Sequence, residues 1–151
     1  MRLFIEFIGA YIGSLGFGVI FNIRGRKLLF AAFGGAAAWV VYSGLAPVIP
    51  GEVMRYLLGT IVAAAYAEIL ARVHRVPVTL YLVSGIMTLV PGNGIYTTMK
   101  YCISGESQLF LETGLHTFAI AGALALGIVL VATVTKMITH LRRRLRGEHR
   151  G

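Results

Sequence analysis

Long apolar runs separated by short clusters of charge are the feature that most restricts how this sequence can fold. A helix needs roughly 20 apolar residues to cross a hydrocarbon core about 30 Å thick, and the chain holds four such runs and a fifth that is interrupted. The sequence therefore predicts an all-α integral membrane protein with a single transmembrane domain. We expect spans at about residues 3–21, 28–46, 53–71, 78–103 and 113–135, followed by a basic cytoplasmic tail at residues 136–151.

The composition argues against other classes of protein. Of the 151 residues 57% are apolar and 13% are charged, whereas a soluble domain is about 45–50% apolar and about 25% charged. The net charge of +8 must sit in the few short polar segments, so a nucleic-acid-binding surface is not expected. The single cysteine, Cys102, allows no intrachain disulfide and no cysteine-based zinc site. We expect no metal, no cofactor and no enzymatic activity, because no catalytic motif is recognisable.

The distribution of basic residues predicts the orientation of the chain. With five spans, eleven of the fourteen Lys and Arg residues fall on one side of the membrane, and only Arg2, Arg55 and Lys100 fall on the other. Because cytoplasmic loops carry the excess of positive charge, we expect the amino terminus outside and the carboxyl terminus in the cytoplasm. The expected location is the bacterial inner membrane.

The fourth apolar segment is interrupted. Residues 78–90 are too few to cross alone, and Pro91, Gly92, Asn93 and Gly94 follow, which favour a broken helix. Broken helices expose backbone groups that can bind the carboxylate and amine of a small zwitterion. The alternative is a kink that binds nothing. The candidate substrate-binding residues are Ser84, Thr88, Pro91, Gly92, Asn93, Gly94, Tyr96 and Thr98.

Two carboxylates are candidates for proton coupling, Glu68 and Glu6, because acidic groups within a membrane span are costly and mark ion or proton pathways. Each has a structural alternative. Glu68 stands four residues before Arg72, the favourable order for an ion pair along a helix, and Glu6 could lie at the interface. Arg55 is expected to snorkel, and His116 either carries a proton or packs between helices.

Pairs of small residues four or three apart predict where helices pack closely. An odd number of spans with several such faces also suggests a partner. The pairs and stripes are Gly9 and Gly13; Ala31 and Gly35; Gly59, Ala63 and Ala67; Ala119 and Gly122; Ala123 and Gly127.

The segment after the fourth apolar run resembles a known family. Residues 89–99, LVPGNGIYTTM, are similar to the PLVPG-x-G-x-Y-x-T-M motif of the threonine/serine exporter family. AEILAR at residues 67–72, followed by Val76 and Pro77, and GFGVIFNIRGRKLL at residues 16–29 also match in order, as does the segment 34–42. The chain resembles the small five-span subunit of the split form, which is similar to the carboxyl-terminal half of fused members.

This resemblance implies a function. Family members are exporters of about ten spans in two unlike halves, so it implies a second five-span subunit, with export of threonine or serine driven by the proton gradient. Some split members are linked to dicarboxylates such as succinate. Pro91, Gly92, Gly94, Tyr96 and Thr98 match the motif, whereas the family commonly has proline at the positions of Ser84 and Thr88.

The sequence thus favours a membrane subunit of a secondary exporter for small amino acids, with lipid and a second subunit as partners. Substrate would lie near the broken helix, and Glu68 or Glu6 would exchange the proton. Three alternatives stay open: a dicarboxylate exporter subunit, a non-transporting assembly subunit, and a homo-oligomeric channel.

Overall fold

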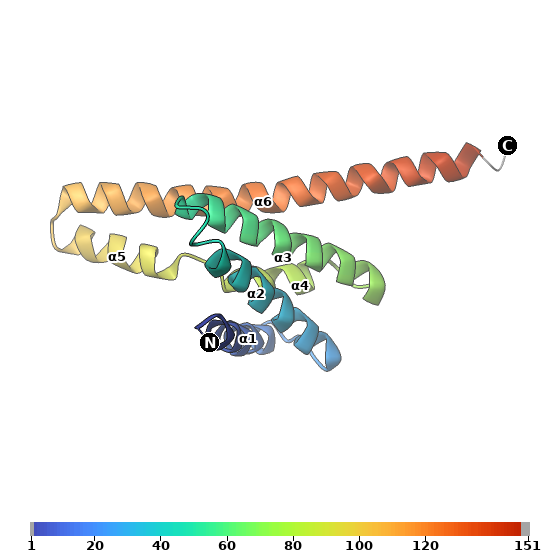
Figure 1. The fold of residues 1–151 in the computed structure, drawn as a ribbon, viewed down its shortest axis with the longest axis horizontal. Coiled ribbons are helices and arrows are strands. Elements are labelled where there is room, and N and C mark those ends of the chain that lie inside the picture. Colours follow the sequence, from blue (N-terminus) through green and yellow to red (C-terminus); the bar gives the residue numbers. More distant parts are fainter. Residues whose placement is uncertain (1, 149–151) are drawn as a thin grey trace.

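The computed structural model describes residues 2–148, with side chains placed for residues 3–141, and its secondary structure is entirely helical. The predicted all-α fold is confirmed. In chain order the helices are α1 (Arg2–Ile20), α2 (Arg26–Gly44), α3 (Glu52–His74), α4 (Thr79–Met87), α5 (Gly92–Ile103) and α6 (Ser107–Glu148), and Figure 1 shows their arrangement.

Turn-forming residues separate the helices. Gly25, with φ of 67°, stands immediately before α2, a conformation that glycine adopts without steric cost. Arg75 ends α3 in the left-handed region, and its amide donates to the carbonyl of Ala71. Pro77 follows two residues after Arg75, and proline cannot continue a helix. These breaks divide the apolar sequence into segments of membrane-crossing length.

Four helices, α1, α2, α3 and α6, are long and apolar enough to cross a membrane. Together α4 and α5 pass the same test as a pair bent by 56°, so the described residues hold up to five spans when this pair is counted as one. The predicted break in the fourth apolar segment is confirmed, and its non-helical residues are 88–91, so Gly92 and Gly94 already belong to α5. The directions of the helices agree with five spans. Glu52 at the start of α3 lies near His116, and Arg72 near the end of α3 lies near Thr139, so α3 and α6 run in the same direction. Two helices that run in the same direction need one complete span between them.

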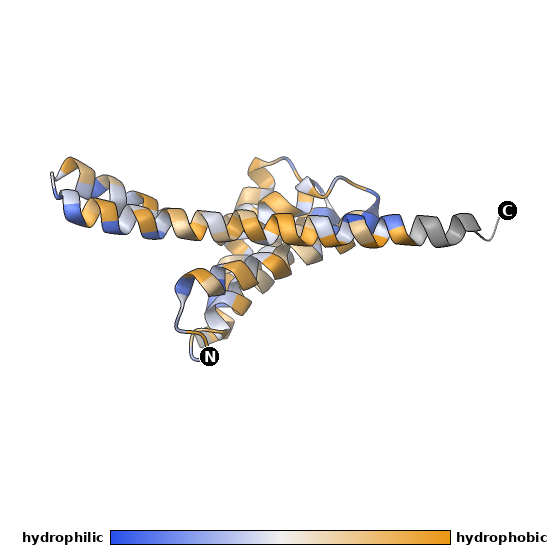
Figure 2. Cartoon of the chain, turned by 90° about the horizontal axis from the view of Figure 1, so that it is seen from above, coloured by the Kyte–Doolittle hydropathy of each residue, from blue (hydrophilic) through white to orange (hydrophobic). Residues whose placement is uncertain are grey.

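Small side chains lie in the interior of the helix bundle, and large apolar side chains lie on its outer surface, where lipid would contact them. Every buried residue of α2 is alanine or glycine, whereas Ile20 and Phe118 are 74% and 81% exposed. Figure 2 shows hydrophobic residues along most of each helix and hydrophilic residues gathered in loops and at helix ends. Lipid tails solvate large apolar side chains as well as a protein core does, so the outward position of these side chains costs nothing in a membrane.

Three of the predicted small-residue faces pack inside the chain. A Cβ on Gly59 would lie 3.1 Å from the carbonyl oxygen of Ala38, and one on Gly35 would lie 2.6 Å from Oγ of Ser14. The third face, on α6, meets α3 at Gly127. The other two faces differ: a Cβ on Gly9, Gly13 or Gly122 would meet no neighbouring atom within 4 Å. Small residues at the same spacing therefore pack against other helices on α2, on α3 and at Gly127 of α6, whereas on α1 and at Gly122 of α6 they lie on an open surface.

The second half of the broken span lies apart from the main bundle. Among the described helices α5 packs against α6 alone, and Figure 1 shows the two running side by side away from the other helices. A Cβ on Gly94 would lie 2.5 Å from Oγ1 of Thr117, and one on Gly114 would lie 3.3 Å from Cγ2 of Thr98. Within the break, Leu89 is fully buried in a cluster with Ala38 and Tyr56. The break therefore lies where the chain leaves the α2–α3 core for α6.

We predict that Gly127→Val destabilises the protein by about 1–3 kcal/mol relative to Gly122→Val, because overpacking carries a cost of that size. A Cβ on Gly127 would lie 2.9 Å from Cβ of Thr60, whereas one on Gly122 would meet nothing within 4 Å. Both variants change helix propensity equally, so the second is a matched control. Melting temperatures in detergent micelles test this, and equal values would contradict the packing described here.

Candidate functional site

The residues around the break do not form one continuous pocket. Pro91 is buried and stands immediately before the first helical residue of α5. Gly92 and Asn93 are exposed in the first turn, where backbone amides have no acceptor within the helix. Tyr96 is 71% exposed, and the hydroxyl of Thr98 donates to the carbonyl of Gly94 over 2.7 Å. Of these predicted residues, Gly94 and Thr98 contact α6, while Tyr96 projects from the surface.

Ser84 connects two helices. Its side chain is fully buried, and its hydroxyl lies 3.1 Å from both the hydroxyl and the carbonyl oxygen of Ser14 on α1. The hydroxyl of Ser14 donates in turn to the carbonyl of Ser84 over 3.0 Å. This reciprocal arrangement satisfies both serines, so Ser84 acts here in joining α4 to α1.

Thr88 lies at the start of the break and reaches a groove. Its hydroxyl is 3.1 Å from the carbonyl oxygens of Gly35 and Gly85. The groove, of about 370 Å³, runs between α1, α2 and the end of α4. Its lining consists of Glu6, Gly9, Ala10, Gly13, Phe17, Trp39 and Thr88.

Two residues for which the sequence predicted different roles lie in this groove. Glu6 was predicted as a proton-coupling group and Thr88 as a substrate ligand, and they line the same space. Gly9 and Gly13 form its α1 side, where the missing side chains leave room. The hydroxyl of Ser43 donates to the carboxylate of Glu6, which ties α1 to the end of α2.

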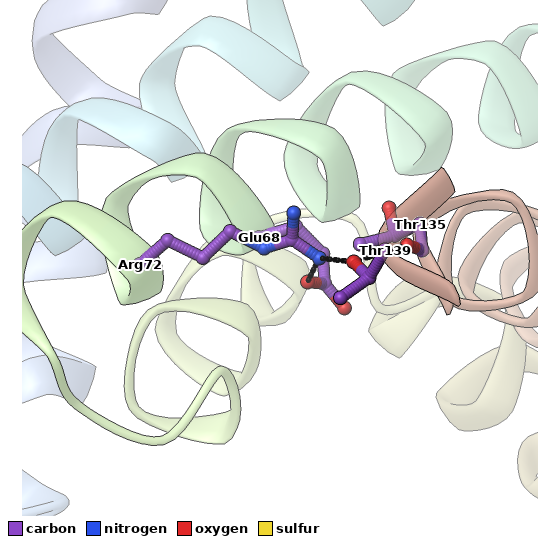
Figure 3. A network of polar contacts seen from close by, with 4 residues as sticks. All are labelled: Glu68, Arg72, Thr135 and Thr139. Atoms are coloured by element: carbon purple, nitrogen blue, oxygen red, sulfur yellow. Dashed lines mark hydrogen bonds and ion pairs between the residues drawn. The ribbon is translucent and has the colours of Figure 1, made fainter. Parts of the chain in front are cut away.

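Glu68 lies in a different groove. Figure 3 shows its carboxylate beside Arg72, with a separation of 3.8 Å between Oε2 and Nη2. The same Nη2 donates to Oγ1 of Thr139 over 3.0 Å, and Thr139 donates to the carbonyl of Thr135. The groove around this network, about 390 Å³, is lined by residues of α3 and α6 alone. The ion pair weighed for Glu68 is thus present, as part of a polar contact between α3 and α6.

A further polar cluster was not predicted from the sequence. Four side chains meet at the start of α3: Tyr42, Glu52, Arg55 and His116. Tyr42 hydrogen-bonds to Glu52, the guanidinium of Arg55 lies over the Tyr42 ring, and Nε2 of His116 lies 3.5 Å from Oε2 of Glu52. The only sequence signal was that Glu52 and Arg55 are three residues apart and share a helix face. Tyr42 and His116 are 74 positions apart in the sequence, so nothing local connected them.

The described part of the chain contains no group of three or more His, Cys, Asp or Glu side chains placed to hold a metal ion. The candidate sites are therefore built from carboxylates, hydroxyls and backbone groups.

We predict that Ser84→Ala lowers stability by about 0.6–1.7 kcal/mol, the range for interhelical hydrogen bonds in membrane proteins. Substrate affinity should stay unchanged, because the hydroxyl of Ser84 is used by Ser14. Ser104→Ala, at an exposed position, is the control. Melting temperature and substrate binding should be measured on the same samples. Weaker binding with unchanged stability would instead place Ser84 in the substrate site.

Comparison with protein families gave one match. The family model described as Threonine/Serine exporter, ThrE, matches residues 6–134. Comparison with curated proteins and with solved structures found no match. The matched region begins at Glu6 and covers the five predicted spans except the first three residues of the first span and the last residue of the fifth. It contains every residue that lines the two grooves except Thr135. The expected resemblance is confirmed: this multi-pass membrane protein belongs to the threonine/serine exporter family.

Proposed function

We propose that the chain is one subunit of a proton-coupled secondary exporter for threonine or serine in the bacterial inner membrane. The family match supports amino-acid export. The segregation of basic residues supports an external amino terminus and a cytoplasmic carboxyl terminus. The observation that carries the mechanism is the groove that joins Glu6 to Thr88 at the break in the fourth span.

The groove suits an amino acid better than a dicarboxylate. Glu6 contributes a carboxylate, which attracts the ammonium group of a zwitterion and repels a dianion such as succinate. Thr88 adds a hydroxyl oxygen to the lining, which can accept a hydrogen bond from the ammonium group. This charge is the reason to prefer a small amino acid over the dicarboxylate alternative.

Glu6 is the better-placed of the two carboxylates for proton exchange. In its ionised form it holds the substrate's ammonium group, and protonation from the outside removes that charge and releases the substrate. Release of the proton to the cytoplasm restores the site. Glu68 forms an ion pair with Arg72, whose guanidinium lies 3.8 Å away and also contacts α6, so its proposed role is to hold α3 on α6.

A second subunit would complete the groove. Gly9 and Gly13 are exposed, and a Cβ on either would meet nothing within 4 Å, so a partner helix can approach the backbone of α1 closely. Such a helix would close the open side of the groove. The same surface could accept a second copy of the chain, which is the homo-oligomeric alternative.

The subunit composition is tested in proteoliposomes by efflux of labelled threonine, serine and succinate. The chain should be reconstituted alone and with a five-span subunit resembling the other half of the family. We expect transport of threonine or serine only in the mixture. Transport by the chain alone would establish the homo-oligomer, and an intact complex without transport would support the assembly role.

We predict that Glu6→Gln slows gradient-driven export at least about tenfold, equivalent to about 1.4 kcal/mol, while Glu68→Gln leaves the coupling intact. Glutamine retains the shape and a hydrogen bond to Ser43 but cannot exchange a proton. Exchange of labelled for unlabelled substrate at equal pH should survive in Glu6→Gln if its site remains formed. Gradient-driven export at the unaltered rate in Glu6→Gln would remove Glu6 from the mechanism.

A further inference from the structure

Four polar side chains from three helices converge at the end of the bundle where α3 begins. Tyr42 of α2 donates its hydroxyl to Oε1 of Glu52 over 3.0 Å. Nε2 of His116, on α6, lies 3.5 Å from Oε2 of the same carboxylate. The guanidinium carbon of Arg55 lies 5.1 Å from the centre of the Tyr42 ring. Glu52 and Arg55, which carry opposite charges, thus both contact Tyr42, Glu52 at its hydroxyl and Arg55 over its ring.

Arg55 has unused hydrogen-bond donors. Its contact within the described residues is with the ring of Tyr42, and its buried Nε has no hydrogen-bond partner there. A guanidinium carries five N–H donors arranged to match a carboxylate. Arg55 as a whole is half-buried, so the guanidinium donors other than Nε can bind an anionic group.

Glu52 can accept further hydrogen bonds. A carboxylate has about four lone-pair positions; Tyr42 donates to one oxygen, and Nε2 of His116 lies 3.5 Å from the other. Its side chain is 39% exposed, so a small molecule can reach it. The carboxylate is fixed in place by its two partners and keeps capacity for an ammonium group.

The cluster adjoins the transport groove. Trp39 lines the groove, and its ring packs on that of Tyr42 with the centroids 5.2 Å apart. Ser43, the residue after Tyr42, holds Glu6. A substrate that leaves the groove past Trp39 therefore meets this cluster next.

We infer that Arg55, Glu52 and Tyr42 form a second binding site for an α-amino-acid zwitterion, at the end of the bundle where α3 begins. Arg55 receives the α-carboxylate and Glu52 the α-ammonium, while the Tyr42 ring and hydroxyl hold the two side chains apart. The adjacent opposite charges of an amino acid match this pair, whereas a simple anion would use only half of it. The inference rests on the proposed export of an amino acid.

Binding of labelled L-threonine to the purified full chain in phosphatidylcholine nanodiscs tests the site. Two competitors each lack one charge: threoninol has no carboxylate, and N-acetylthreonine has no ammonium group. The measurement is repeated in a Gly13→Phe background, whose ring fills the groove and so separates this site from the groove. The wild-type chain should prefer threonine to both competitors.

Arg55→Gln should weaken threonine binding about 10- to 100-fold, the value of a charge-assisted hydrogen bond, and should abolish the preference for threonine over threoninol. Glu52→Gln should abolish the preference over N-acetylthreonine. Lys100→Gln removes an exposed positive charge elsewhere in the chain and should change neither preference. These selective losses distinguish recognition from misfolding, which would weaken all three ligands alike.

The inference is wrong if Arg55→Gln keeps the threonine-over-threoninol preference, or if the wild-type chain binds no threonine. It is also wrong if phosphatidylglycerol, and not threonine, raises the melting temperature in an Arg55-dependent manner, because the site then binds a lipid phosphate. None of these results bears on the proton-coupling role of Glu6, which the export measurement on Glu6→Gln decides separately.

Discussion

Apolar side chains gain nothing from packing against one another when lipid already surrounds them, so helices in a membrane are held by close contact and by hydrogen bonds. The rest of this structure depends on that constraint. The buried residues of α2 are all alanine or glycine, and α3 faces them with Gly59, Ala63 and Ala67. Small interior residues bring the backbones close, and the large apolar side chains are left to face lipid.

The same constraint explains where polar side chains lie. Inside the bundle they are used in pairs that satisfy each other, as in the Ser14–Ser84 contact between α1 and α4. Toward the helix ends they join neighbouring helices, as Arg72 does between α3 and α6. Glu6 differs because it lines an open groove as well as joining α1 to α2. A carboxylate in that position can act on a substrate while the core stays unchanged.

Sequence reasoning predicted the features that are local along the chain. The lengths of the apolar runs predicted the spans, and the run from Pro91 to Gly94 predicted the bend between α4 and α5. One feature that depends on distant neighbours was not predictable. Gly9 and Gly59 each begin a small-residue stripe with the same spacing, yet one stripe lines a groove and the other packs against α2. The helix α6 extends beyond its predicted span in both directions, because apolar length predicts the part that can lie in the membrane and not where the helix begins and ends.

Substrate protection of an introduced cysteine tests the central claim that the α1 groove is the substrate pathway. In a Cys102→Ser background, Gly13→Cys places a thiol in the groove, and Gly122→Cys places one on an open face of α6. The rate of labelling by a small thiol reagent should be measured with and without threonine, in the assembled complex. We expect threonine to slow labelling at position 13 and not at position 122. Equal rates with and without threonine at position 13 would contradict this account.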